Sequence, residues 1–440
     1  MKTKDRLELA HWVVQQAQKA GADEVAVNLV NNREIDVEVR EQKLDQLKES
    51  TQNSLGLTIY VDHRYSSQST NDLRRDSLGR FVTEAVAMTK YLSPDEFRYL
   101  PDPKYYEGQA DLDLKTMDAD YDALSSQERI KFAQEIENAA RAHSDQVITC
   151  NSGFSDSQYE AIKVHSNGFE GVSRGTSYSA GGEATVKDEG DARPSDWDWR
   201  TVRFRREMPS PDELGRNSVV RALAKVGQKK MDSGVYEMVI ENRSASRLLY
   251  SLIEPLSGSS LQQKRSFLDG KLGQQIASEK LTIIDDPLIV SGHGSRLYDG
   301  EGLAAKRRPI IEKGVLKSFY IDTYYGRKLG VEPTTSGTSN LVFDLGDKTL
   351  EELVAQMKRG ILVTGFIGGN SNSTTGDFSV GVMGVYVENG KRVKPVNEMN
   401  VSGNLADVLM QLAEMGNDTW TYSSWLRPSM YFNEIQFSGV

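Results

Sequence analysis

The 440 residues of this chain are too many for one ordinary hydrophobic core, so about two or three domains are expected. Hydrophobic residues make up 38% of the chain and charged residues 26%, as in globular proteins, which argues against a long disordered tail. The net charge is -10 and the most basic stretch is only Lys306-Arg307-Arg308, so tight binding to nucleic acid is not expected.

The N-terminus and the cysteine content indicate the compartment. Residues 1–6 are mostly polar or charged and an amphipathic stretch follows them, so no signal peptide is expected. No segment approaches the roughly 18 consecutive apolar residues of a membrane span. Cys150 is the only cysteine, which excludes an intrachain disulfide, and its place in an apparent strand favours packing over nucleophilic chemistry. We therefore expect a cytoplasmic protein.

A helix, a small sheet and a second helix are predicted for the N-terminal α+β region, residues 1–91. Apolar residues recur at helical spacing over residues 5–20 and again over residues 78–88. Three strand-like segments lie between them: residues 24–29, 34–39 and 54–61. Residues 92–125 are rich in Pro, Asp and Tyr and are predicted to form a linker.

A middle α+β region is predicted for residues 126–232. Ser125 and Glu128 form a capping box that opens a helix through about residue 142. Strands and turns follow, with hairpin signals at Asn167-Gly168 and Gly181-Gly182. The polar segment 187–199 is predicted as a long loop. A further helix is expected over residues 209–231.

Residues 233–440 are predicted to form a larger, β-rich C-terminal domain. It begins with a strand at 236–240 and a helix at 244–257, and its last helix contains Leu405 to Leu412. The short strands expected between and after these are 281–284, 309–312, 315–321, 381–387 and 434–437. Such regular short strands with glycine turns are typical of a strongly curved or barrel-like antiparallel sheet. The predicted fold class is therefore α+β.

The chain lacks the common catalytic motifs. Its histidines are His11, His63, His143, His165 and His293. No two share a helix face, and neither HExxH nor HExxxH occurs, whereas a catalytic zinc needs about three protein ligands. There is also no GxSxG elbow and no P-loop. His293, between two glycines, is the best single candidate, with a satisfied loop histidine as the alternative. A hydrolytic site around His293, Asp285 and Glu301 remains an open hypothesis.

One glycine-rich segment, residues 365–384 (GFIGGNSNSTTGDFSVGVMG), lies between two apolar strands. Glycine permits close approach of the backbone to a ligand or to another chain. The segment is either a loop that binds peptide or lines a cleft, or a wide, tightly turned β connection.

The same segment carries a resemblance to the TldD/PmbA family, whose members are also known as modulators of DNA gyrase. The resembling segments in the C-terminal part are 370–379 (NSNSTTGDFS), 386–391 (YVENGK), 395–396 (PV), 403–405 (GNL) and 408–409 (VL). Those in the rest of the chain are 56–62 (GLTIYVD), 69–73 (STNDL), 165–169 (HSNGF), 266–273 (SFLDGKLG) and 281–287 (LTIIDDP). They occur in collinear order over nearly the whole chain.

The resemblance implies which of two branches applies. TldD-like members carry an HExxxH helix and a downstream ligand, whereas PmbA/TldE-like members lack them. The two histidine positions correspond here to about Leu249 and Glu254, and the region before Asn370 holds no Cys or His. The chain thus resembles the PmbA/TldE-like branch, which implies no catalytic residue and no metal in this chain.

The resemblance further implies a heterodimer with a TldD-like catalytic subunit that holds a zinc-type metal and acts on unfolded peptides. A homodimer of this chain in the absence of that partner is left open. The residues expected to contact peptide are Phe366, Asn370, Thr375, Asp377 and Phe378. The alternative is a stand-alone protein-binding or regulatory homodimer of the gyrase-modulator type, without peptidase activity.

Overall fold

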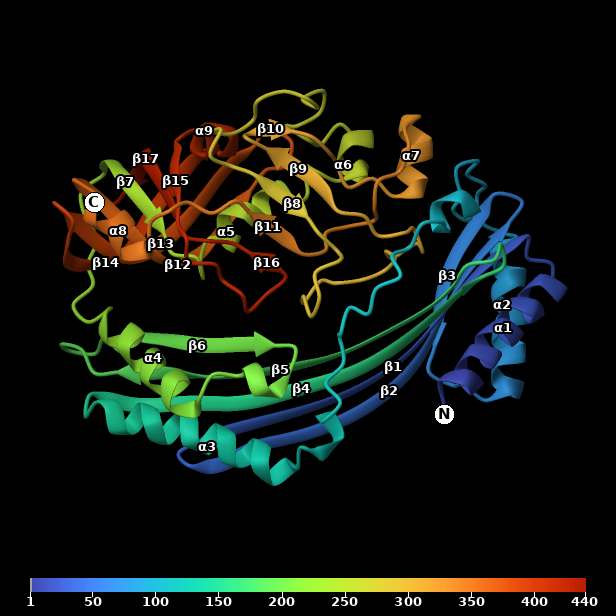
Figure 1. Ribbon diagram of the computed structural model, residues 1–440, viewed down its shortest axis with the longest axis horizontal. Coiled ribbons are helices and arrows are strands. Elements are labelled where there is room, and N and C mark those ends of the chain that lie inside the picture. Colours follow the sequence, from blue (N-terminus) through green and yellow to red (C-terminus); the bar gives the residue numbers. More distant parts are fainter. Residues whose placement is uncertain (1) are drawn as a thin grey trace.

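The computed structural model describes residues 2–440 (Figure 1). Its N-terminal half is organised around one six-stranded sheet of order β3-β2-β1-β4-β5-β6, in which every neighbouring pair is antiparallel. The strands are β1 (Glu24–Arg40), β2 (Lys43–Val61), β3 (Arg64–Thr70), β4 (Val147–His165), β5 (Glu170–Val186) and β6 (Ser195–Val202). The sheet therefore joins strands from the N-terminal and the middle regions. The sheet is curved, with its concave side toward the C-terminal domain, which lies above it in this view.

Helices α1 (Thr3–Lys19) and α2 (Arg75–Thr89) cover one end of this sheet, as the sequence predicts. The apolar stripe of α1, including Val13 and Ala17, is buried against Val27 and Leu57 of the sheet. The expected strands at 24–29 and 34–39 are a single strand, β1. The prediction of two strands was wrong because residues 31–34 remain paired with both neighbouring strands, although residues 31–33 are only half-buried and Glu34 is exposed.

Helices α3 (Ser126–His143) and α4 (Pro211–Leu223) cover the other end. The predicted capping box is confirmed: Ser125 and Glu128 exchange side-chain and backbone hydrogen bonds. Arg129 and Asp156 form a buried bidentate ion pair that fixes α3 to β4, with Nε–Oδ2 and Nη2–Oδ1 distances of 2.5 and 2.9 Å. Cys150 is fully buried and burial raises the pKa of its thiol to about 12, which fits the packing role.

Two predictions for this region were wrong. Asn167-Gly168 does connect β4 to β5, but Gly181-Gly182 lies inside β5. A Cβ on Gly181 would be 2.1 Å from the Asp198 carbonyl oxygen and 2.8 Å from the Trp199 ring, so glycine there permits close packing within the sheet. Residues 195–199 of the expected loop at 187–199 belong to strand β6, whose two tryptophans alternate with aspartates.

The segment 92–125 is largely irregular, with short 3-10 helices η1 (Pro103–Tyr106) and η2 (Tyr121–Ala123). It is held to the C-terminal domain near α7 (Thr323–Leu329). The Arg98 guanidinium lies between the rings of Tyr65 and Tyr324, 4.4 and 3.4 Å from their centroids. Arg327 also donates hydrogen bonds to three carbonyl oxygens of this segment. The segment thus ties the N-terminal sheet to the C-terminal domain.

The C-terminal domain contains a closed β-barrel, which confirms the predicted strong curvature. Its strands are β7 (Gly234–Ile240), β12 (Arg359–Ser371), β13 (Asp377–Glu388), β14 (Lys391–Asn404) and β17 (Met430–Ser438). The ring closes through the β14–β17 pairing, and only β7 and β12 are parallel. Strand β15 (Leu412–Met415) extends the sheet from β17. A large apolar core fills the domain.

Shorter elements surround the barrel. A second sheet has the order β10-β9-β8-β11-β16. Its strands are β8 (Ile283–Asp285), β9 (Arg308–Glu312), β10 (Val315–Leu316), β11 (Leu341–Phe343) and β16 (Trp425–Leu426). The short helices of this domain are α5 (Ser246–Leu249), η4 (Tyr250–Leu252), α6 (Gly258–Gln262), α8 (Leu350–Ala355) and α9 (Leu405–Met410), whereas η3 (Arg205–Glu207) lies between β6 and α4. The single helix predicted at 244–257 is broken into α5 and η4, and Pro255 cannot continue it. No helix among residues 2–440 combines the length and the apolar character needed to cross a membrane.

Candidate functional site

The residues expected to contact peptide do not form one cluster. Phe366 is half-buried and lines a pocket, whereas Asn370 is exposed further along β12. Thr375 and Asp377 are exposed and come together at the start of β13, where the Thr375 hydroxyl donates to Asp377 Oδ2 at 2.8 Å. Phe378 is only 5% exposed and packs in the barrel core. Phe366 is therefore the member of this set that is best placed to meet a ligand.

The pocket at Phe366 lies where the barrel meets the middle region. Its volume is about 410 Å³. The barrel contributes Thr364, Gly365, Phe366 and Met383, β6 contributes Asp196 and Trp197, and the segment after β7 contributes Arg243, Ser244 and Arg247. The pocket therefore combines one apolar wall with several charged groups.

Asp196 is the centre of these charges. Its carboxylate accepts a hydrogen bond from Arg243 at 3.2 Å and lies 3.2 Å from Lys225 Nζ and 3.5 Å from Arg221 Nε. Burial would raise the pKa of Asp196, but the coulombic attraction of Arg221, Lys225 and Arg243 outweighs burial and lowers it. The aspartate is therefore held ionised and joins β6 to α4 and to the chain after β7.

A second carboxylate, Glu241, extends the network to the barrel. Arg221 Nη1 and Nη2 bind its two oxygens at 3.1 and 2.5 Å. Arg221 and Ser244 both donate to the carbonyl oxygen of Thr364, two residues before Phe366. Arg243 also lies over the Trp197 ring, 3.5 Å from its centroid, and burial lowers the pKa of its guanidinium to about 10. The network fixes the backbone that presents Phe366.

Sequence reasoning missed the network because its members are isolated charged residues from separate parts of the chain. The five are Asp196, Arg221, Lys225, Glu241 and Arg243. The only signal in the sequence is the alternating Asp-Trp-Asp-Trp of residues 196–199, which is typical of a half-buried strand but lies within the segment predicted as a loop.

The two positions that the resemblance relates to metal ligands have different environments. Leu249 is buried in the apolar core, and Glu254 is exposed at the surface. The segment before Asn370 contributes only glycine and apolar residues. In the part of the chain that the structure describes, no group of three or more His, Cys, Asp or Glu side chains is placed to hold a metal ion. The residues at this place do not fit a catalytic metal.

The hypothetical hydrolytic residues His293, Asp285 and Glu301 also have separate environments. His293 lies in a loop, where burial and then Arg203 lower its pKa to about 4. Asp285 is buried and accepts hydrogen bonds from Tyr320 and Ser339. Glu301 accepts two from Thr323, at 2.8 and 2.6 Å. No hydrogen bond or ion pair connects the three within residues 2–440.

Glu301 is expected to make stability depend on pH. Burial raises its pKa from 4.5 to about 7 although the two hydrogen bonds from Thr323 lower it. Because the folded state binds this proton more tightly than the unfolded state, the contribution is complete below about pH 4.5 and is lost as pH rises to about 7. A loss of about 2–3 kcal/mol is expected over this window. Urea unfolding of Glu301→Gln across this window should show a flatter profile. The surface change Glu254→Gln is the control, and an unchanged slope in Glu301→Gln would contradict the assignment.

Known proteins show similarity over nearly the whole chain. Three domain descriptions match: PmbA/TldA metallopeptidase domain 1 over residues 25–89, the central domain over 119–226 and the C-terminal domain over 233–439. Metalloprotease PmbA of Escherichia coli O157:H7 is 29% identical over 432 residues, which are 96% of this chain and 93% of that protein.

Two solved structures share the fold. A Bacteroides thetaiotaomicron protein, described as a candidate modulator of DNA gyrase, has 42% identity and a TM-score of 0.97, with 100% of both chains covered. TldE from Thermococcus kodakarensis has 21% identity and a TM-score of 0.84, with 98% of this chain and 100% of that chain covered, which is a likeness of fold alone.

Proposed function

Because the chain belongs to the PmbA/TldD metallopeptidase family, we propose that it is the non-catalytic, TldE-like subunit of a TldD/TldE-type metallopeptidase that degrades or trims unfolded peptides. The observation that carries the proposal is the character of the two positions related to metal ligands. Leu249 is part of the apolar core and Glu254 is at the surface, so this chain would depend on a TldD-like partner for its zinc-type metal.

In this proposal the chain supplies substrate contacts rather than chemistry. Arg247 donates to the carbonyl oxygens of Gly368 and Gly369, which fixes the exposed segment that follows Phe366. A supported, glycine-rich strand can bind an extended peptide through main-chain hydrogen bonds, with little dependence on sequence. The Phe366 ring would contact one substrate side chain, and Asn370, Thr375 and Asp377 remain candidate contacts on the exposed part of the hairpin.

Reconstitution tests the proposal. Hydrolysis of an unstructured peptide would be measured with this chain alone, with a TldD-type partner alone and with the mixture, each with and without chelator. We expect hydrolysis by the mixture only, and its loss with chelator. Chelator-sensitive hydrolysis by this chain alone would overturn the non-catalytic assignment. An inactive mixture together with a stable homodimer of this chain would favour the alternative, a regulatory protein without peptidase activity.

Phe366→Ala is expected to lower kcat/KM of the reconstituted complex by about tenfold, because one apolar contact of this size contributes about 1–2 kcal/mol. Peptide hydrolysis under steady-state conditions measures the effect. Val393→Ala is the matched control, since Val393 is an exposed apolar residue on β14 that does not line the pocket. Equal kcat/KM for Phe366→Ala and Val393→Ala would exclude Phe366 as a substrate contact.

A further inference from the structure

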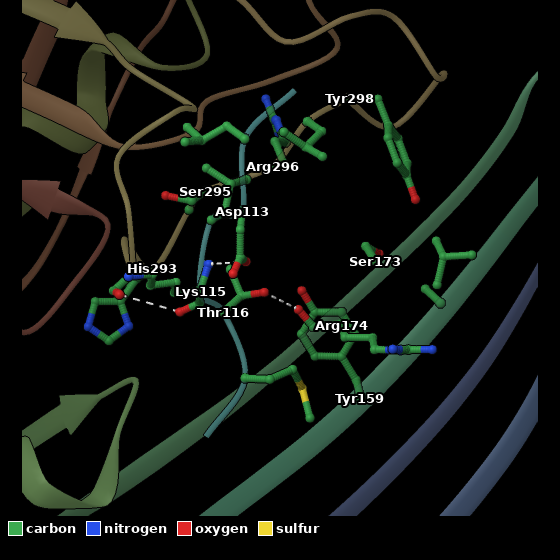
Figure 2. A pocket seen from close by; sticks show the side chains of 18 of the residues that line it. Asp113, Lys115, Thr116, Tyr159, Ser173, Arg174, His293, Ser295, Arg296 and Tyr298 are labelled. Atoms are coloured by element: carbon green, nitrogen blue, oxygen red, sulfur yellow. Dashed lines mark hydrogen bonds between the residues drawn. The ribbon is translucent and has the colours of Figure 1, made fainter. Parts of the chain in front are cut away.

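A larger cleft lies away from Phe366, between the N-terminal sheet and the C-terminal domain (Figure 2). Its volume is about 1030 Å³. Its walls are β4 and β5, the loop 291–299 and residues 112–117, which we call the strap because they cross from the sheet to that loop. None of these residues belongs to the pocket at Phe366.

The cleft contains an open strand edge. Strand β6 pairs with β5 only between Tyr178 and Thr185, so the N-terminal portion of β5 has no strand on that side. The strap covers one point of this edge: Thr176 N–H donates to the Thr116 carbonyl at 2.9 Å, and the Thr116 hydroxyl donates to the Arg174 carbonyl at 2.6 Å. The cleft is lined by residues from both faces of β5, as expected at a free edge.

The strap then turns away from β5. Lys115 has a positive φ of 47°, and the Leu114 carbonyl accepts from Ser291 N–H in the C-terminal domain at 2.7 Å. In an antiparallel ladder, alternate residues direct both backbone groups to the same side. The backbone groups of Thr176 and Arg174 point away from β4, toward the strap. The N–H and C=O of Val172, two residues before Arg174, therefore point the same way. The outward N–H and C=O of Val172 and the N–H of Arg174 have no hydrogen-bond partner outside the sheet among residues 2–440.

The cleft is basic although the chain is acidic. Its charged lining residues are Lys115, Lys163, Arg174, Arg206 and Arg296, against Asp113 and Asp299. Both aspartates already accept hydrogen bonds from backbone N–H groups of their own loops. Arg174 is paired with Glu160 at 2.7 Å.

The other four cationic residues of the lining form no ion pair with any residue that the structure describes. They are Lys115, Lys163, Arg206 and Arg296. Lys163 Nζ is half-buried and donates to the Gly300 carbonyl, and Arg296 donates only to neutral oxygens of Thr335 and Gly337. Cations that are partly removed from water without a counter-ion favour an anionic ligand.

We propose that this cleft binds an extended, acidic peptide segment, which adds as a strand to the open edge of β5 at Val172 and Arg174. The unpaired backbone groups would satisfy the main chain of the peptide, and Lys115, Lys163, Arg206 and Arg296 would attract its carboxylates. The rings of Tyr298 and Tyr159 lie against Gly171 and Gly175 of β5 and provide flat surfaces beside the edge. The site is separate from the Phe366 pocket and needs neither a metal nor a catalytic partner.

Fluorescence anisotropy on this chain alone tests the proposal. The probe is a fluorescein-labelled octapeptide of alternating Glu and Val, compared with the same peptide carrying Lys in place of Glu. A third peptide has the acidic sequence with its alternate backbone amides N-methylated, which removes the donors needed for strand addition. We expect binding of the acidic peptide and at least about tenfold weaker binding of the other two.

Protein variants assign the binding to this cleft. Val172→Pro removes an outward N–H that takes no part in the β4–β5 ladder, and it should weaken binding of the acidic peptide at least about tenfold. Lys115→Glu with Arg206→Glu should have a similar effect. The control is Lys43→Glu with Lys48→Glu, the same charge change on an exposed part of β2, which should bind as the wild type does.

Three results would overturn the proposal: no binding of the acidic peptide, equal binding of the acidic and basic peptides, or full binding of the N-methylated peptide. Thermal unfolding of each variant shows whether it is folded, and the peptide comparison on the unaltered chain decides the matter if Val172→Pro does not fold. Because no partner or metal is present, failure of the reconstituted peptidase would leave these results unchanged.

Discussion

Asp196→Ala is expected to lower the free energy of unfolding by about 3–5 kcal/mol. The change leaves Arg221, Lys225 and Arg243 close together around a buried site, with only Glu241 and the more distant Asp198 to balance them. The network also fixes the Thr364 carbonyl, so the reconstituted complex should lose activity through displacement of Phe366. Urea unfolding followed by circular dichroism measures the loss of stability.

A double mutant distinguishes two causes of this loss of stability: repulsion among the three cations and loss of the packing of Asp196. Arg243→Met removes one of the three cations, and in the Asp196→Ala background it should recover about 1–2 kcal/mol. Asp45→Ala, on the exposed part of β2, is the control and should change stability by less than about 0.5 kcal/mol. If Asp196→Ala were as stable as this control, the network would have no structural role.

Gly384→Ala is expected to lower stability by about 3–4 kcal/mol, a large effect for one methyl group. The added Cβ would lie 1.9 Å from the Leu362 carbonyl oxygen and 3.1 Å from Val363 Cα. Both atoms belong to the backbone of β12, so the clash can be relieved only by separating two strands of the closed barrel.

Differential scanning calorimetry of Gly384→Ala measures this effect. Gly337→Ala is the matched control, because an added Cβ there meets no atom within 4 Å and the glycine does not have a positive φ. Its unfolding free energy should stay within about 0.5 kcal/mol of the unaltered chain. Equal stability of the two variants would mean that the barrel can adjust its strands at little cost.

The sequence was sufficient for elements whose signals are local. The capping box at Ser125 and the apolar stripe of α1 predicted helices that the structure contains. The short strands and glycine turns of residues 233–440 predicted a curved sheet, and the barrel confirms it. The ordered segments around residues 370–379 were sufficient for the family.

Elements that depend on distant packing were not predicted. Gly181-Gly182 has the composition of a turn, but Asp198 and Trp199 of the neighbouring strand require glycine inside β5. The periodicity of residues 244–257 is helical and its leucines do pack in the core, but the segment is broken into α5 and η4.

The candidate site was predictable only in part. Phe366 was singled out and does line a pocket, but its role as a peptide contact stays a prediction, as do those of Asn370, Thr375 and Asp377. The buried position of Phe378 gives it a packing role in the core. The charges around Asp196 come from three separate segments, and no spacing in the sequence brings them together.

The pairing of β7 with β17 also determines when the barrel can form during synthesis. Ile240 pairs with Met430, and Gly234 pairs with Phe437. The first strand of the barrel, β7, therefore cannot complete its pairing until the last strand, β17, has been synthesised. On the ribosome, the sheet of β1 to β6 can assemble once Val202 has emerged, whereas one edge of β7 stays unpaired until β17 has emerged as well. Such long-range pairing folds slowly and exposes strand edges in the nascent chain. The C-terminal domain is therefore the part of the nascent chain whose strand edges stay exposed longest.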